Sequence, residues 1–199
     1  MLKIEWDGKK LEEVIKNYPG NYTILDYWIP LWVYVDDLEI SGLKEIPGGD
    51  VTHIITFLPE LLSIIQLFDP EKLDKRDFIY ERNANENLIT GGGFRFMVDH
   101  DETTDLLNIN YTSKGIQEWR TITIPLKEYT EGVLLATREM ISDIQRIAPE
   151  ANRDDDGLHS LKKDYNTICG WYEERYHEPP EEKYVIPNRF YRKTNPPYS

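Results

Sequence analysis

The stretch from Phe94 to Ile147 constrains the fold of this chain more than any other. It opens with three runs of strand-like residues, Phe94–Asp99, Leu106–Thr112 and Ile116–Ile124. A short polar loop joins the first two runs, and a tight Ser113-Lys114-Gly115 turn joins the last two. Because such short connections join antiparallel strands, the pattern predicts a three-stranded antiparallel meander over residues 94–124.

A long amphipathic helix is expected directly after the meander, over residues 126–147. Its apolar residues recur at spacings of three and four, which places them on one side of the helix: Leu126, Tyr129, Val133, Ala136, Met140, Ile144 and Ile147. A sheet with one apolar face needs a cover, and this helix is the nearest one. The meander and the helix together predict an α+β domain.

The N-terminal half adds shorter elements. Its patterns predict a strand over Leu2–Trp6, a helix over Lys9–Asn17, strands over Tyr22–Tyr27 and Leu31–Val35, and a hairpin return over Leu38–Ile40. Pro30 lies between two of these strands and has no N–H to donate, so we expect it in a bend or on a sheet edge. The pair Asp36-Asp37 is expected to form the hairpin turn.

A second amphipathic helix is predicted over residues 51–68, where eight apolar residues fit one stripe. Pro59 complicates this prediction, because a proline inside a helix removes a backbone hydrogen bond. Either the helix is kinked there, or residues 51–57 form a strand and the helix begins near Pro59. We favour the kinked helix, with Asp50 as its N-cap.

The last helix is predicted over residues 157–176, with its N-cap within Asp154–Asp156. Gly170 interrupts its pattern, so we expect close packing against a neighbouring element there. Between the two halves, Phe78–Glu81 could form a short strand. The glycines at 91–93 precede a strand and not a helix, so they are interpreted as a bulge or hinge and not as a phosphate-binding loop.

These elements predict one domain over residues 1–177. In it, one antiparallel sheet combines the meander with the N-terminal strands and is covered by three amphipathic helices. A chain of 199 residues is long enough to bury such a core without disulfides. From Glu178 onward, five prolines and no helical period predict an extended, proline-rich tail over residues 178–199.

Charge and composition restrict the partners. The net charge of -13 disfavours nucleic-acid phosphates and anionic membrane surfaces, and no apolar run is long enough to span a bilayer. The single cysteine, Cys169, excludes an internal disulfide, and the first residues do not resemble a secretory signal. We therefore expect a cytoplasmic protein that binds neither nucleic acid nor membrane and needs no cofactor.

Catalytic motifs are absent from the sequence. The loop 99–105 gathers carboxylates and His100, but it lacks the glycine and the terminal glutamate of a calcium loop, and a solvated hairpin tip explains the same residues. Cys169 lies on the apolar stripe of the last helix, where a thiol is a poor nucleophile. An acidic surface attracts basic proteins, although it also serves solubility.

The hypothesis that follows is a non-enzymatic binding protein whose acidic surface engages a basic protein partner. Its concrete form is an immunity-type inhibitor of a basic bacterial toxin, by analogy with a class of small acidic proteins. The candidate partner-binding residues are Trp32, Tyr34, Asp36, Asp37, Glu39, Asp99, Asp101, Glu102 and Asp105. The alternative is a metal-assisted hydrolase that uses the acidic 99–105 loop.

Overall fold

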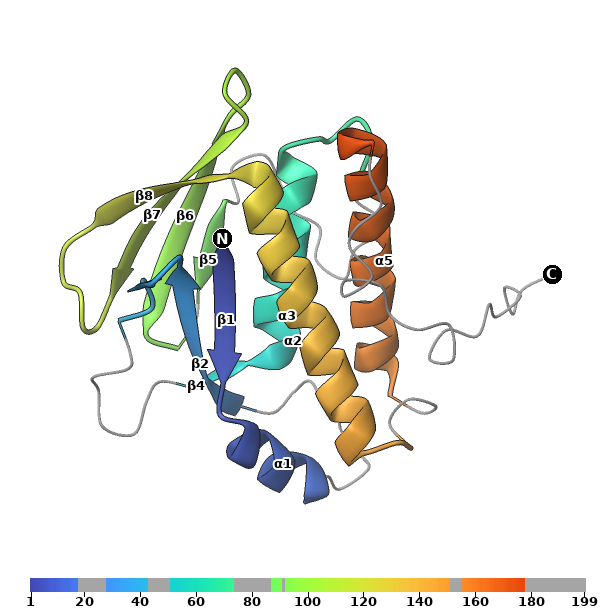
Figure 1. Ribbon diagram of the computed structural model, residues 1–199. Coiled ribbons are helices and arrows are strands. Elements are labelled where there is room, and N and C mark those ends of the chain that lie inside the picture. The colour runs from blue at the N-terminus through green and yellow to red at the C-terminus, as the bar shows by residue number, and fades with distance from the viewer. Residues whose placement is uncertain (18–27, 43–50, 74–86, 91, 151–154, 178–199) are drawn as a thin grey trace.

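A computed structural model of the chain describes residues 1–17, 28–42, 51–73, 87–90, 92–150 and 155–177 (Figure 1). The elements follow in the order β1 (Leu2–Trp6), α1 (Gly8–Lys16), β2 (Trp28–Val35), β3 (Leu38–Glu39), β4 (Val51–His53), α2 (Ile54–Ser63), η2 (Ile64–Leu67), β5 (Leu88–Thr90), β6 (Phe94–Asp101), β7 (Leu106–Ser113), β8 (Arg120–Pro125), α3 (Leu126–Ile147) and α5 (Asp156–Tyr176). The predictions for Tyr22–Tyr27, Asp50, Phe78–Glu81, Gly91 and the tail lie outside the described residues.

The predicted meander is confirmed as the strands β6, β7 and β8, which pair antiparallel in that order. Two details differ from the prediction. β8 begins at Arg120 and not at Ile116, because Ser113 and Ile116 bond each other's backbones at 3.0 Å and close a tight turn. The short strand β5, which the sequence did not indicate, pairs antiparallel with β6.

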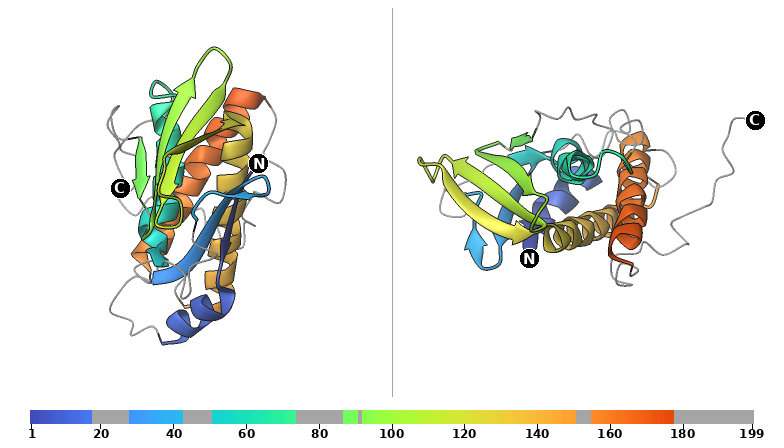
Figure 2. Two further views of the ribbon diagram at one scale, coloured as in Figure 1. Left: turned by 90° about the vertical axis from the view of Figure 1, so that its left-hand side faces the viewer. Right: turned by 90° about the horizontal axis from the view of Figure 1, so that it is seen from above.

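The N-terminal strands form a sheet of their own, so the prediction of one combined sheet was wrong. β2 lies between β1 and β3 and also pairs with β4. The outer side of β1 is occupied by α3, where Gly132 lies against the backbone of Leu2, and no strand of the meander can add there. Figure 2 shows the two sheets beside each other with the helices on one side.

Pro30 lies inside β2 and not in a bend between strands. It is the last residue of β2 to pair with β4, opposite Val51, and Leu31 is the first to pair with β1. Its carbonyl accepts a hydrogen bond from Asp7 N at 3.1 Å. The strand therefore continues through the proline at the point where its neighbours change.

The helices agree with the sequence to different degrees. α3 has the predicted bounds, and Asp155 caps α5 by accepting a hydrogen bond from Leu158 N at 2.8 Å. The predicted helix over residues 51–68 is shorter, because Val51–His53 pair with β2 as β4 before α2 begins. α2 contains Pro59 and continues directly into the 3-10 helix η2. The predicted α-helix is therefore replaced by a strand at its start and by a 3-10 helix at its end.

α5 packs on α2 and α3, forming a second layer outside the helices that contact the strands (Figures 1 and 2). The prediction for Gly170 in α5 was wrong. A Cβ at this exposed position would meet no atom of the described residues within 4 Å. The close approach lies at Gly132 in α3, where a Cβ would be 2.1 Å from Leu2 O.

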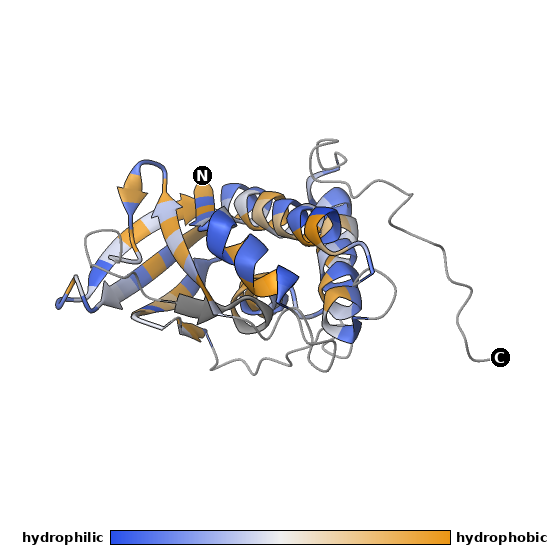
Figure 3. Cartoon of the chain, turned by 90° about the horizontal axis from the view of Figure 1, so that it is seen from below, coloured by the Kyte–Doolittle hydropathy of each residue, from blue (hydrophilic) through white to orange (hydrophobic). Residues whose placement is uncertain are grey.

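One continuous core joins both sheets to the helices. Its largest fully buried side chains include Tyr129 of α3, Tyr165 of α5 and Phe57 of α2. Hydrophobic and hydrophilic residues alternate along the strands, as Figure 3 shows, so each sheet has an inner and an outer face. Within the described ranges, no helix combines the length and apolarity that crossing a membrane requires.

Candidate functional site

The first predicted acidic segment is the turn between β2 and β3. Asp36 and Asp37 are both exposed, and Asp36 adopts a positive φ of 54°, which a tight turn requires and which aspartate tolerates. Asp36 N donates a hydrogen bond to Met1 O at 3.0 Å, and its carboxylate pairs with the amino group of Met1. The turn is therefore fixed to the start of β1.

The second predicted acidic segment is the tip of the β6–β7 hairpin. The carboxylate of Asp101 accepts hydrogen bonds from Thr103 N at 2.9 Å, from the Thr103 hydroxyl at 2.6 Å and from the Thr104 hydroxyl at 2.9 Å. These bonds lower the pKa of Asp101, so it remains charged. Glu102 beside it is exposed.

Each of the two turns is linked to the first turn of α3, although they are more than sixty residues apart in the chain. Leu126 N donates to Asp105 O at 3.0 Å, which fixes the hairpin tip to the helix start. Glu128, in the same first turn, lies 2.9 Å from the amino group of Met1, which also pairs with Asp36. We call this surface the acidic end and define it by Asp36, Asp37, Asp101, Glu102 and Glu128.

A partly buried cluster of side chains holds the hairpin tip against α5; sequence reasoning did not identify it. Arg175 donates to Asp105 at 2.7 Å and to Asp69 at 3.5 Å. Trp171 Nε1 also donates to Asp69, at 3.0 Å, and His100 Nε2 lies 3.0 Å from Asp105. The five residues come from three parts of the chain: the segment that follows η2, the β6–β7 hairpin and α5. No local spacing could therefore have indicated the whole cluster.

Asp105 is the centre of this Arg175 cluster. Burial alone would raise the pKa of its carboxyl group, but the hydrogen bonds from His100 and Arg175 and the charge of Arg175 outweigh burial and lower it. The backbone of Asp105 has a positive φ of 55°, which the contacts to α3 and α5 hold in place. Asp105 is therefore a structural anchor, and it is less available to a partner than Glu102.

The other predicted partner-binding residues lie nearby but differ in exposure. Asp99 is exposed, and its carboxylate accepts hydrogen bonds from Asn87 at 2.7 Å and Asn110 at 3.2 Å. Glu39 is half-buried and accepts from the hydroxyl of Ser41. Tyr34 is only 8% exposed, so it belongs to the packed part of the sheet.

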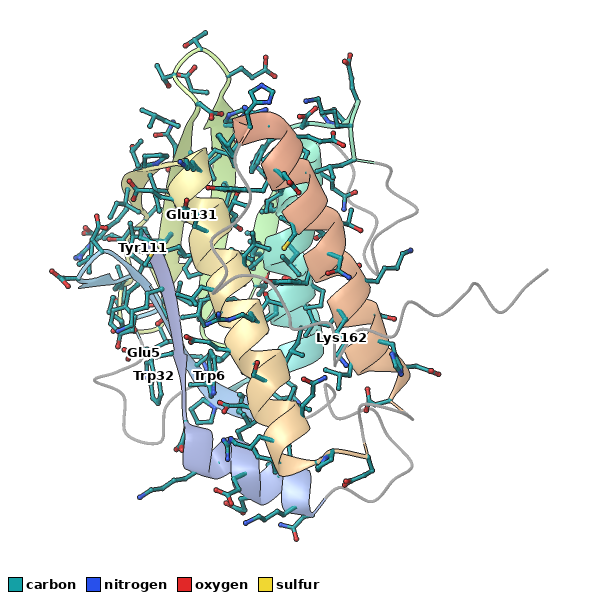
Figure 4. The ribbon with its side chains drawn as sticks, turned by 45° about the vertical axis from the view of Figure 1, so that its right-hand side comes forward. Glu5, Trp6, Trp32, Tyr111, Glu131 and Lys162 are labelled. Atoms are coloured by element: carbon teal, nitrogen blue, oxygen red, sulfur yellow. The ribbon has the colours of Figure 1, made fainter. Side chains whose placement is uncertain are left out.

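Trp32 lines a surface groove between β1 and α3 with a volume of about 420 Å³. Figure 4 shows Trp32 beside Glu5 and Trp6, at the end of β1 that leads to α1. The indole of Trp6 donates to Asp143 of α3 at 3.3 Å, and Lys3 pairs with Glu5 at 2.5 Å. The groove thus carries paired charges and is not part of the acidic end.

Two groups on α5, the partly buried Cys169 and the buried Lys162, have displaced pKa values. Burial raises the pKa of the Cys169 thiol to about 12, although a hydrogen bond with Tyr165 opposes the shift. Burial lowers the pKa of Lys162 to about 8, against the opposing charge of Asp155. Figure 4 shows Lys162 on α5, away from the acidic end.

The carboxylates of the 99–105 loop do not converge. Asp99 faces two asparagines, Asp101 faces two threonines, and Asp105 faces His100 and Arg175. In the part of the chain that the structure describes, no three His, Cys, Asp or Glu residues are placed to hold a metal ion.

Comparison with known proteins adds no family: no family model, no curated protein and no solved structure matches this chain.

Proposed function

We propose that this protein is a non-enzymatic, cytoplasmic binding protein whose acidic end engages a basic protein partner. In its concrete form it is an immunity-type inhibitor of a basic bacterial toxin. The observation that carries the proposal is that two acidic turns are each linked to the first turn of α3, one through the carbonyl of Asp105 and the other through the amino group of Met1. A face of this kind speeds association with a positively charged protein.

The geometry supports this role in two ways. The β2–β3 turn and the β6–β7 tip are fixed by hydrogen bonds to β1, α3 and α5, so their exposed carboxylates need little ordering when a partner binds. The proposed contact residues are Asp36, Asp37, Asp101, Glu102 and Glu128, with Asp99 and Glu39 at the margins. Tyr34 is left out because it is buried.

The metal-assisted hydrolase has no comparable support. Its loop residues bond to different neighbours and leave no shared position for a cation, as described above. We therefore propose only the binding function.

The experiment is a pull-down from source cells, followed by binding kinetics with the captured partner. Asp37→Asn combined with Glu102→Gln removes two exposed charges that make no structural bond in the described chain. We expect association to slow about three- to tenfold at low salt, with dissociation nearly unchanged.

The matched control combines Glu13→Gln on α1 with Glu150→Gln after α3, two exposed acids that change the net charge equally. This control should leave the association rate almost at the wild-type value. The proposal is wrong if both double variants slow association equally, if only acidic proteins are captured, or if binding strengthens as salt rises.

A further inference from the structure

β8 forms one border of the second sheet, whose strand order is β5-β6-β7-β8 (Figure 1). It runs straight into α3 and carries only one charged residue, Arg120. Thr121 and Thr123 are exposed, Ile124 is buried, and Ile122 is only partly buried against the core. An edge strand of this kind can accept another strand.

The ladder with β7 shows which backbone groups of β8 point outward. Leu126 N donates a hydrogen bond to Asp105 O at 3.0 Å, so the backbone groups of this residue pair point toward each other between the two strands. Because bonding alternates along an antiparallel pair, Ile124 and Ile122 also bond to β7, while Thr123 and Thr121 direct their N–H and C=O groups away from it. These outward groups have no backbone partner among the described residues.

The equivalent edge of the first sheet is protected. There α3 lies along the outer side of β1, with Gly132 against Leu2 O. No described helix or loop donates to or accepts from the outward backbone of β8 in the same way. An uncovered edge that continues without a bulge is the type that native sheets use for strand addition.

We propose that β8 pairs antiparallel with β8 of a second copy of this chain, about a twofold axis at Ile122. The sequence Thr121-Ile122-Thr123 is a palindrome, so the register is self-complementary. Thr121 faces Thr123 of the second copy, and the outward N–H and C=O groups of both residues form the new ladder. The two copies then share one continuous eight-stranded sheet, four strands from each copy.

Charge favours a second copy over a basic partner at this edge. In the proposed register Arg120 faces Ile124 of the second copy, so no like charges oppose each other. A basic partner would meet Arg120 here and would be drawn to the acidic end instead. The pairing also places Ile122 of each copy together and brings Trp119, 53% exposed, opposite Pro125 of the second copy. This inference is independent of the proposed toxin-binding function.

The test measures the molar mass of the full chain by light scattering and sedimentation over a concentration series up to about 1 mM. Thr121→Glu with Thr123→Glu places like charges opposite each other twice and should weaken dimerisation at least about tenfold. Thr121→Lys with Thr123→Glu loses the same threonine contacts to Asn110 and Asn108, but it opposes unlike charges and should keep the dimer.

The control Thr90→Glu with Met97→Glu adds two acids to the same exposed face, away from β8, and should also keep the dimer.

Cysteine substitution checks the register independently. Ile122→Cys should form a disulfide between copies on oxidation, because residue 122 faces itself across the axis, whereas Thr123→Cys should not. A wild-type chain that stays monomeric, or a double-glutamate variant that stays dimeric, overturns the proposal.

Discussion

Gly132 offers a sharp test of the packing between α3 and β1. Replacing a glycine inside a helix by alanine normally stabilises a protein by about 1 kcal/mol, because alanine has the higher helix propensity. At Gly132 the added Cβ would lie 2.1 Å from Leu2 O and 2.8 Å from Leu2 C. Both are backbone atoms of a paired strand, so no side chain can rotate away to relieve the clash.

The expected size follows from this geometry. Reaching an ordinary contact of 3.4 Å requires α3 and β1 to separate by about 1.3 Å. Overpacking of this kind costs about 3 kcal/mol where the backbone must move, which exceeds the gain in helix propensity. We expect Gly132→Ala to lower the free energy of unfolding by about 2 kcal/mol and the Tm by about 4–8 °C.

Gly170→Ala is the matched control, since a Cβ there meets no described atom within 4 Å. It should raise the free energy of unfolding by about 1 kcal/mol. Urea denaturation followed by circular dichroism measures both variants under the same conditions. If Gly132→Ala stabilises the protein as Gly170→Ala does, the close approach of α3 to β1 is refuted.

Four further predictions concern ionisable groups and the tail. Cys169 should react with thiol reagents slowly in the native protein and rapidly in urea, because burial raises the pKa of its thiol to about 12; fast native labelling would contradict this. Lys162 has a pKa lowered to about 8, so the wild type should gain stability relative to Lys162→Met as pH rises from about 8 to about 10, measured by urea denaturation at each pH. The lowered pKa of Asp105 stabilises the fold above its ordinary pKa of 3.8, so the advantage over Asp105→Asn should disappear as pH falls below that value. Deleting residues 178–199 should change the Tm by only a few degrees, whereas a large fall would show that the tail packs on the domain.

Local patterns were enough to predict the elements whose stability is local in origin. The strands β6 and β7 and the helix α3 have long runs with one clear period, and their bounds follow the sequence closely. α2 was predicted less well, because the residues before Ile54 fit a helical stripe but pair with β2 instead. Tertiary pairing with β2 overrode the helical stripe that the sequence favoured for these residues.

The arrangement of the two sheets could not be predicted in this way. It depends on Gly132, whose role is visible only once α3 lies beside β1, and on Pro30, which lies where β2 changes partners. Close packing was predicted at Gly170 instead, because that glycine interrupts the helical pattern of the last helix. A glycine in a sequence shows that the backbone there carries no Cβ, but it does not show which element, if any, packs closely against it.

The acidic turns illustrate the same distinction for the site. The sequence pattern predicted Asp36-Asp37 and the 99–105 loop as turns, but their links to the start of α3 depend on contacts between distant segments. Gathering carboxylates at one end of the molecule costs electrostatic free energy. The start of α3 reduces this cost, because the helix dipole favours negative charge there. Arg175 reduces it further by pairing with Asp105 and Asp69. The hairpin tip can therefore remain ordered while Glu102 and its exposed neighbours stay unneutralised, which is the condition that electrostatic attraction of a basic partner requires.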